Sequence, residues 1–504
     1  MEMAEPKART DRCWDLREWI ALLEEKGELK RICAEVDWDE ELGAIARRNS
    51  HKGGPALLFE NIKGYKDTAC QKLFTNGLGS TRRLALSLRL PPDSDDRTIT
   101  RTLKNRFAGR VEPVKVSSGP VQENIIRGKD VDLFSLPVPR WNFRDGGRYI
   151  NTSSGVVTMD PETKVMNIGT YRGMIGTRNT IPTLLLASQH WGHHFSKYKR
   201  LGQEMPVAVV YGWDPTLFIA STAQLTHPGY SEYETTGSLA QAPVELVKCQ
   251  TSDLWVPASA EIVIEGKISS DPGTFEMEGP FAEYVGYYGG FASKKPVIRV
   301  ECIAHRNNPI FRGCLEGGTP DGISEPYYFM THSKSATIWN HLEMENIGEI
   351  LGVWSGFLAR GTNIRIQIRK TYRGQAKQIA HAVWGSHLAV HSGKMIIVVD
   401  EDIDVFDTEA VDWAVAYRVN AERGDVQIAH GCIGSELDPS TPLEERNVPK
   451  YGQGAWSPVL IDATVDWNLK MEPQYGNERL PPRASDISPE MAQLVERKWK
   501  EYGL

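Results

Sequence analysis

The apolar positions in the first part of the chain predict a small domain of mixed helices and strands. Asp15 and Glu18 are spaced as a capping box at the start of a helix. The apolar side of this helix recurs at helical spacing, at Leu16, Trp19, Ile20 and Leu23. Short apolar runs predict strands near 28–32 and 56–59. We therefore expect an N-terminal mixed α/β domain at residues 1–115.

Residues 116–312 have a different texture, because short alternating segments are separated by frequent turns. The strands that we expect are 154–159, 165–171, 207–211 and 260–268. Helices are expected at 183–201 and 238–241. This pattern predicts a β-barrel or a β-sandwich.

Residues 313–470 contain longer helical patterns, at 334–345 and 374–390. The continuous apolar run at 395–399 is typical of a strand that is buried on both faces. Together these patterns predict a C-terminal α/β domain, which makes the whole chain an α+β multidomain protein.

The last segment, 471–504, begins as a polar, proline-rich arm and ends in a helix. Ser488 and Pro489 suit the N-cap and the first helical position. The apolar stripe of the helix consists of Met491, Val495, Trp499 and Tyr502. A terminal helix at the end of an arm often docks on another subunit, so we expect a homodimer or a higher homo-oligomer. Packing of this helix on its own chain is the alternative.

Net charge, apolar runs and cysteine spacing limit the partners and the compartment that we expect for the protein. The net charge of −7 gives no electrostatic case for nucleic acid or an anionic membrane as a partner. No segment approaches the roughly 20 apolar residues that span a bilayer, and residues 1–10 lack the apolar run of a signal peptide. We therefore expect a cytoplasmic protein. The seven cysteines are scattered and contain no C-x-x-C, which favours neither a disulfide framework nor a zinc knuckle.

The stretch 275–290 interleaves acids, aromatic residues and glycines. Gly279-Pro280 prevents a continuous helix, so a bend sets the positions of Glu278 and Glu283, and we expect both to face one pocket. Apolar cover favours the protonated form of a carboxyl group, which suits proton transfer. The aromatic residues that we expect around the pocket are Phe281, Tyr284, Tyr287 and Tyr288. The alternative is an aromatic-rich loop with two surface acids.

The sequence contains no phosphate-binding loop of a familiar kind and no G-x-S-x-G. A set of polar residues stands out instead, with Asn167, His190 and Glu232 among them. Oxygen ligands with a single imidazole suit Mn²⁺ or Mg²⁺ better than zinc. His193 and His194 follow His190, but we expect at most one of the three to bind a metal.

Several short motifs occur in a characteristic order. They are Asn167-(x)₄-Arg172, Gln189-His190, Ser231-Glu232, Glu278-Gly-Pro-Phe-x-Glu283 and Asp402-Ile403-Asp404-Val405. In these motifs the chain resembles the UbiD family of prenylated-flavin-dependent decarboxylases, from about Asp15 to the last helix. The resemblance implies a central split β-barrel that holds prenylated FMN, and a dimer joined by the terminal helix.

The resemblance also implies roles for single residues. Asn167, His190 and Glu232 correspond to ligands of a Mn²⁺ ion that ties the cofactor phosphate to the protein. Ser221 and Thr222 lie in the stretch that helps to hold K⁺ and the phosphate. The expected cofactor-binding set is Asn167, Thr170, Tyr171, Arg172, Gln189, His190, Ser221, Thr222 and Glu232. The expected catalytic network is Arg172, Glu278 and Glu283.

The implied reaction is a reversible, non-oxidative decarboxylation of an aromatic, heteroaromatic or α,β-unsaturated carboxylic acid. It would run through a covalent adduct with prenylated FMN, loss of CO₂ and protonation by Glu283. We expect Arg172 to pair with Glu278. A flavin prenyltransferase would supply the cofactor. The alternatives are a non-catalytic subunit of a carboxylase complex and a Mn²⁺-dependent hydrolase.

Two departures from the family pattern bear on the substrate. Some relatives carry a lysine near the cofactor, where this chain has Leu388, so we assign no cofactor lysine. The segment 434–439 stands in the place of a substrate-covering loop and lacks an aromatic residue that some relatives use there. This makes a cinnamate-like substrate doubtful. Segments 374–376 and 400–407 look closest to the hydroxybenzoate branch, so we favour a ring carboxylate.

Overall fold

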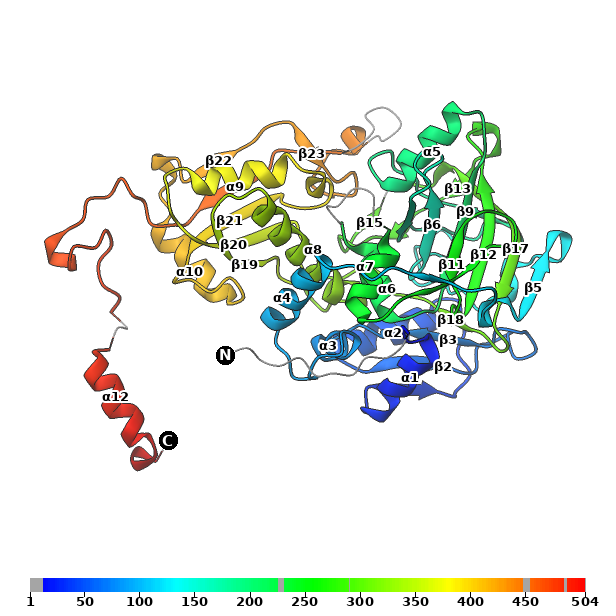
Figure 1. Ribbon diagram of the computed structural model, residues 1–504, viewed down its shortest axis with the longest axis horizontal. Helices are drawn as coiled ribbons and strands as arrows, with labels where there is room; N and C mark the ends of the chain where they lie inside the picture. The colour runs from blue at the N-terminus through cyan, green and yellow to red at the C-terminus, as the bar shows by residue number, and fades with distance from the viewer. Residues whose placement is uncertain (1–11, 225–230, 290, 447–453, 485–486, 504) are drawn as a thin grey trace.

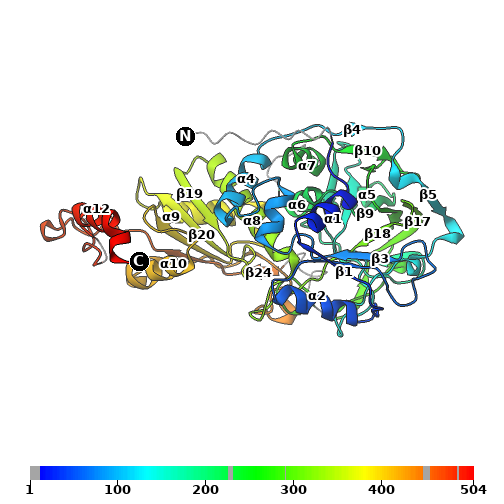
Figure 2. The same cartoon turned by 90° about the horizontal axis from the view of Figure 1, so that it is seen from below.

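The computed structural model describes residues 12–224, 231–289, 291–446, 454–484 and 487–503 (Figure 1). Residues 1–10, in which no signal peptide is predicted, and Gly290, at the end of the acid-aromatic stretch, lie outside these ranges. Figures 1 and 2 show the central sheet and the C-terminal sheet toward opposite ends of the main body, with α4 and α8 between them. None of the helices in the described ranges has the length and apolar character needed to cross a bilayer.

Helix α1 (Leu16–Glu25) begins at the predicted capping box. The Asp15 carboxylate accepts a hydrogen bond from the Glu18 amide at 2.8 Å, and the Glu18 carboxylate accepts one from the Asp15 amide at 2.8 Å. The four predicted stripe residues are all buried. The helices that follow are α2 (Glu41–His51), α3 (Thr81–Ser87) and α4 (Asp96–Phe107).

The N-terminal region contains a four-stranded sheet with the order β1-β2-β3-β18. Its strands are β1 (Leu29–Ile32), β2 (Ala56–Phe59), β3 (Lys72–Thr75) and β18 (Ile310–Arg312). The last strand comes from a distant part of the sequence and pairs in parallel with β3. The predicted domain boundaries, after residues 115, 312 and 470, stay predictions.

The central region is built on a seven-stranded sheet whose paired strands are all antiparallel. Its main path is β5-β17-β12-β9-β6-β7, and β8 pairs with β17. The strands are β5 (Asn124–Arg127), β6 (Gly155–Met159), β7 (Met166–Gly169), β8 (Thr180–Pro182), β9 (Met205–Tyr211), β12 (Ile262–Ile268) and β17 (Val297–His305). Helices α5 (His190–Arg200), α6 (Pro215–Thr222) and α7 (Glu232–Ala240) accompany it.

The sequence analysis expected a β-barrel or a β-sandwich, and the resemblance implied a split β-barrel; the described residues form no closed barrel. A closed barrel requires its first and last strands to pair, and β5 and β7 do not pair in the described residues. The chain leaves β7 and passes directly into residues 170–172, which line a cavity instead of extending the sheet.

The C-terminal region contains a five-stranded sheet with the order β19-β20-β21-β25-β22. Its strands are β19 (Glu349–Trp354), β20 (Asn363–Arg369), β21 (Met395–Asp400), β22 (Val426–Ile428) and β25 (Val459–Asp462). Ile396 and Val398 pack in one apolar cluster, whereas Ile397 and Val399 pack in another. The predicted burial of this strand on both faces is therefore confirmed.

Helices α8 (Glu325–Met344), α9 (Gln375–Trp384) and α10 (Thr408–Arg418) complete the C-terminal region, and a short 3₁₀ helix, η5 (His387–Val390), follows α9. Smaller sheets join β4 (Val114–Lys115), β10 (Glu245–Lys248) and β11 (Trp255–Pro257), and pair β23 (Cys432–Gly434) with β24 (Gly454–Trp456). Two more ribbons pair β13 (Glu276–Glu278) with β16 (Ser293–Lys295), and β14 (Phe281–Ala282) with β15 (Tyr288–Gly289).

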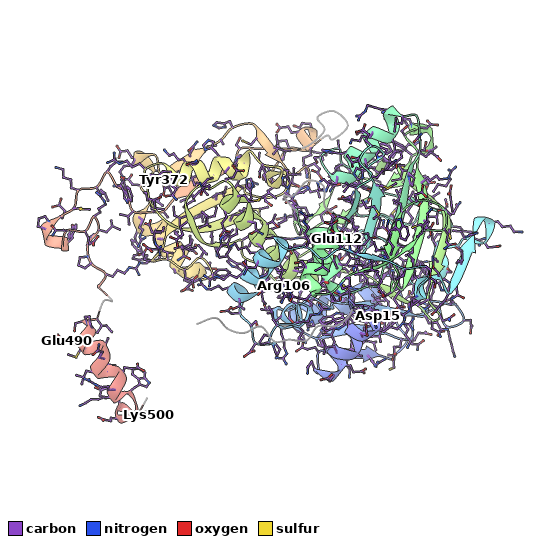
Figure 3. All side chains as sticks on the ribbon, in the orientation of Figure 1. Asp15, Arg106, Glu112, Tyr372, Glu490 and Lys500 are labelled. Carbon is purple, nitrogen blue, oxygen red and sulfur yellow. The ribbon has the colours of Figure 1, made fainter. Side chains whose placement is uncertain are left out.

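The terminal helix α12 (Pro489–Lys498) has its N-cap at Ser488, as predicted, and none of its residues is buried. Figures 1 and 3 show this helix, which carries Glu490, at the end of an arm that leads away from the main body. The helix therefore does not pack on its own chain in this structure. Docking on a second subunit remains a prediction.

Candidate functional site

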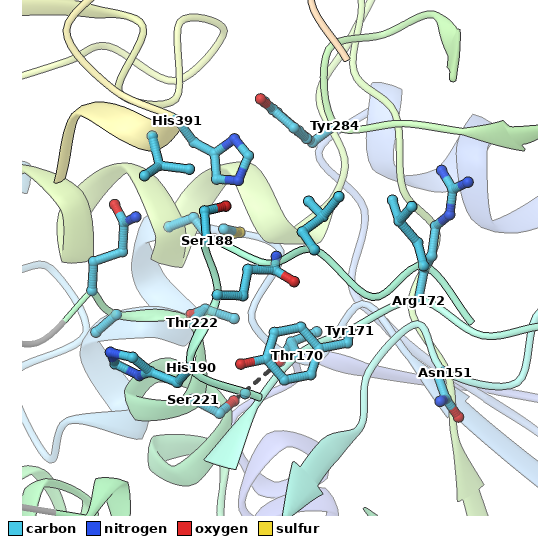
Figure 4. A pocket seen from close by; sticks show the side chains of 18 of the residues that line it. Asn151, Thr170, Tyr171, Arg172, Ser188, His190, Ser221, Thr222, Tyr284 and His391 are labelled. Atoms are coloured by element: carbon cyan, nitrogen blue, oxygen red, sulfur yellow. Dashed lines mark hydrogen bonds between the residues drawn. The ribbon is translucent and has the colours of Figure 1, made fainter. Parts of the chain in front are cut away.

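A cavity of about 320 Å³ lies between the central region and the C-terminal region. All the residues predicted to bind the cofactor line it, and so does Glu283. Figure 4 shows His190, Ser221 and Thr222 toward one side of this cavity, and His391 and Tyr284 toward another. Glu278 is not among the lining residues.

Arg172 joins the two predicted acids. One guanidinium nitrogen donates to Glu278 Oε2 at 2.9 Å, and the other donates to Glu283 Oε1. The sequence analysis paired Arg172 with Glu278, and the structure adds Glu283 as a second partner. Burial lowers the pKa of Arg172, but the Glu283 and Glu278 carboxylates outweigh this and raise it. Arg172 therefore stays positively charged between the carboxyl groups of Glu278 and Glu283.

Residues that do not line the cavity hold the Gly279-Pro280 bend between Glu278 and Glu283 in place. A cis peptide bond joins Gly279 to Pro280, between β13 and β14. The Gly146 amide donates to the Pro280 carbonyl at 2.8 Å. Tyr149, which is fully buried, donates its hydroxyl proton to Glu278 Oε1 at 2.9 Å. Glu278 is thus fixed by both Tyr149 and Arg172.

The aromatic cover is smaller than predicted. Phe281 and Tyr284 line the cavity, but Tyr287 and Tyr288 do not. Tyr287 is 63% exposed, and the Tyr288 hydroxyl accepts a hydrogen bond from the Arg144 amide at 3.4 Å. The pairing of β14 with β15 explains why Tyr287 and Tyr288 do not line the cavity. It folds Tyr288 and Gly289 back against Phe281 and Ala282.

The three predicted metal ligands are neighbours on the cavity wall. His190 Nδ1 lies 2.8 Å from Asn167 Oδ1, and Glu232 accepts a hydrogen bond from the Ile168 amide at 2.7 Å. Burial raises the pKa of Glu232 to about 7. No lysine or arginine in the described ranges forms an ion pair with this carboxylate. A buried acid without a basic partner, beside an amide oxygen and an imidazole, is a chemical fit for a hard divalent cation.

The other histidines of α5 differ in their surroundings. His193 lines the cavity, whereas the ring of His194 lies 2.9 Å from the Thr158 hydroxyl. Burial lowers the pKa of His194 to about 4, which keeps it neutral. The hydroxyls of Thr170 and Ser221 lie 3.2 Å apart (Figure 4).

A second set of residues lines the cavity on the wall formed by the C-terminal region. The sequence analysis missed Glu316, Lys334, Arg360 and His391 as lining residues. Lys334 lies on α8 in a run of residues without helical alternation, so no local pattern marked it. Leu388, where the sequence analysis assigned no cofactor lysine, does not line the cavity. Glu436 and Leu437, which also line the cavity, belong to the predicted substrate-covering segment.

Models of 3-octaprenyl-4-hydroxybenzoate carboxy-lyase, named UbiD, match the chain in succession. The N-terminal domain model matches residues 20–103, the Rift-related domain model residues 112–319, and the C-terminal domain model residues 327–463. A phenolic acid decarboxylase of Sedimentibacter hydroxybenzoicus is 35% identical over 466 residues, which cover 90% of this chain and 91% of the relative.

Solved structures show the same likeness. A vanillic acid decarboxylase of Sedimentibacter hydroxybenzoicus, in closed form, has a TM-score of 0.86 at 31% identity, with 98% of this chain and 100% of that chain covered. An evolved dimeric form of the UbiD-class enzyme HmfF from Pelotomaculum thermopropionicum, in complex with prFMN, has a TM-score of 0.76 at 31% identity, with 96% and 99% covered. The chain therefore belongs to the UbiD family of carboxy-lyases.

Proposed function

We propose that the protein is a reversible, non-oxidative decarboxylase of an aromatic or heteroaromatic carboxylic acid, with prenylated FMN as its cofactor. The observation that carries this proposal is the Glu278-Arg172-Glu283 network at the wall of a cavity lined by the predicted cofactor-binding residues. The relatives that act on phenolic and vanillic acids support a ring carboxylate as substrate.

Asn167, His190 and Glu232 would hold the cofactor through Mn²⁺, because they offer two oxygen ligands and one imidazole from one wall. Ser221 and Thr222 would place hydroxyl oxygens toward K⁺ and the phosphate. When bound, the prenylated flavin would supply an electron sink for the carbon that loses CO₂.

The protein's own contribution is to deliver a proton to that carbon. Glu283 lies on the cavity wall and is the group placed to donate it, whereas Glu278 is held away from the cavity by Arg172 and Tyr149. Arg172 stabilises the charge that appears on Glu283 once the proton has left. In the carboxylation direction Glu283 would accept the same proton.

Replacement of Glu283 tests this assignment. Glu283→Gln is expected to retain the flavin and to lower CO₂ release by about 100-fold or more, because the proton donor is removed. The measurement is turnover of hydroxybenzoates by protein made together with a flavin prenyltransferase, with flavin content read from the absorbance spectrum. Glu276→Gln is the matched control, since Glu276 accepts a hydrogen bond from Thr180 at 2.9 Å and does not line the cavity.

Turnover of Glu283→Gln at the wild-type rate would refute the assignment. Bound flavin without turnover of any ring acid by the wild type would favour the non-catalytic subunit. A ligand extract without flavin, identified by mass spectrometry, would favour the Mn²⁺-dependent hydrolase.

We also propose that α12 docks on a second copy of the chain. Met491 of α12 is 48% exposed, and Trp499 and Tyr502, in the 3₁₀ helix η9 (Trp499–Tyr502) that follows it, are 48% and 51% exposed. Apolar surface of this kind on a helix outside the main body suits an interface between subunits.

A further inference from the structure

The cavity wall that the C-terminal region contributes carries two buried cations. Lys334 is 5% exposed and Arg360 is 4% exposed, and both line the cavity. Lys334 comes from α8, whereas Arg360 lies between β19 and β20. Neither residue belongs to the network around Glu283 or to the predicted metal ligands.

Only one of the two cations forms an ion pair with an acid in the described part of the chain. Arg360 donates to Glu316 at 3.3 Å, which supplies one negative charge. Lys334 donates to the backbone carbonyl of His391 at 3.0 Å, and no carboxylate in the described part of the chain forms an ion pair with it. Burial, and then the nearby Arg360, lower the pKa of Lys334 to about 7. A buried ammonium group without a counter-charge favours an anion as its neighbour.

The wall that carries Lys334 lies on a different side of the cavity from the predicted phosphate anchor. Lys334 contacts the backbone of His391, which fixes its place on this wall. Figure 4 shows His391 on a different side of the cavity from His190, which belongs to the predicted anchor.

We propose that Lys334 and Arg360 form a cationic subsite that binds an ionised oxygen substituent on the substrate ring. The inference rests on the proposed function, because it places a ring acid in the cavity. A phenolate oxygen accepts hydrogen bonds from an ammonium and from a guanidinium group, and such charge-assisted bonds are the strong ones. Burial lowers the pKa of His391 to about 3, which keeps the ring neutral, and its Nδ1 has no hydrogen-bond partner among the described residues. The subsite would select hydroxylated ring acids over unsubstituted ones.

The test compares two probes that differ by one hydroxyl group, 4-hydroxybenzoate and benzoate. Their dissociation constants are measured by calorimetry on holoenzyme that carries Glu283→Gln, so that turnover does not interfere. We expect 4-hydroxybenzoate to bind about tenfold or more tightly than benzoate, and Lys334→Met to remove most of that preference while benzoate binding and flavin content stay unchanged.

Lys370→Met is the matched control. Its ammonium also donates to a backbone carbonyl, that of Val465 at 2.7 Å, but it does not line the cavity. The hydroxyl preference should survive in this variant. If Lys334→Met does not fold, Lys334→Gln, which keeps a polar group of smaller size, replaces it.

Three outcomes would overturn the subsite. They are equal binding of the two probes by the Glu283→Gln protein, an unchanged preference in the Lys334 variants, and loss of flavin from them, which would assign Lys334 to the cofactor. Because these are binding measurements, they are separate from the proposed function, which fails if the wild-type holoenzyme releases no CO₂ from any ring acid.

Discussion

At the scale of single residues, Tyr149 shows how a group outside the cavity positions one inside it. Its hydroxyl is shared between Glu278 Oε1 at 2.9 Å and the Pro280 carbonyl at 3.1 Å, so one residue holds both the first acid and the bend. Glu278 in turn holds Arg172, which contacts Glu283. The orientation of the proposed proton donor therefore depends on a tyrosine that does not line the cavity.

Removal of this hydroxyl should weaken catalysis without loss of the cofactor. We expect Tyr149→Phe to lower kcat by about tenfold, because Glu278 loses a buried hydrogen bond and Arg172 becomes less well fixed. The measurement is steady-state turnover together with flavin content. In the control Tyr65→Phe, the hydroxyl lost donates to the Phe134 carbonyl at 3.0 Å and accepts from Arg148, and none of these residues lines the cavity, so kcat should not change. A fall in flavin content that matches the fall in kcat would contradict the positioning role.

Sequence reasoning reached part of this site and missed the rest for a physical reason. Glu278 and Glu283 lie within one short motif around Gly279-Pro280, so their proximity is a local property of the chain. Lys334 and Arg360 meet the cavity only because α8 and the β19-β20 connection pack against it, which no local spacing encodes. The prediction that Tyr287 and Tyr288 line the pocket was wrong, because the β14-β15 pairing was not anticipated.

At the scale of elements, the start of a helix with one buried face was predicted more accurately than the start of a helix that is buried on several sides. Helix α1 has an apolar stripe and a capping box, and its start agrees with the prediction. Helix α8 was expected at 334–345, but it begins at Glu325 because its first turns are buried on several sides and show no alternation. Helix α3 likewise has no solvated basic side at Arg83, which is 1% exposed and pairs with Glu28 at 2.9 Å.

Gly146, in the 142–146 loop, lies so close to the Gly279-Pro280 bend that a substitution there tests the contact between them. A Cβ atom on Gly146 would lie 2.0 Å from the Gly279 carbonyl oxygen, so the backbone of the bend would have to move. We expect Gly146→Ala to lower the free energy of unfolding by about 1–3 kcal/mol and to lower turnover as Glu278 shifts. Chemical denaturation and the CO₂ assay measure the two effects.

Gly273→Ala is the control for this substitution, because its Cβ would meet only the side chain of Asp271, at 3.2 Å. Its stability and turnover should stay close to those of the wild type. A Gly146→Ala protein with unchanged stability would show that the loop and the bend are not in rigid contact.

At the scale of the whole molecule, the arm is joined to the main body by a small set of contacts. The Arg483 guanidinium donates to Asp402 and lies over the Trp413 ring, 5.1 Å from its centroid. Helix α12 buries none of its own residues. The stability of the single chain therefore does not depend on this helix.

A chain that ends after Lys470 should fold and lose its self-association. We expect the melting temperature of the monomer to change little, because no described residue after Lys470 is buried and the Arg483 contact with Asp402 lies at the surface, while the mass in solution falls to that of one chain. Light scattering coupled to gel filtration measures the mass. An oligomer that survives the truncation would place the interface elsewhere on the molecule.

The cavity takes its proton-transfer groups from the central region and its second cationic wall from α8 and the β19-β20 connection. These two sets of residues share no hydrogen bond in the described part of the chain, so substitutions in one set need not disturb the other. Directed evolution confined to 330–334 and 360 would therefore be a route to new ring specificities that leaves the acid-base chemistry intact.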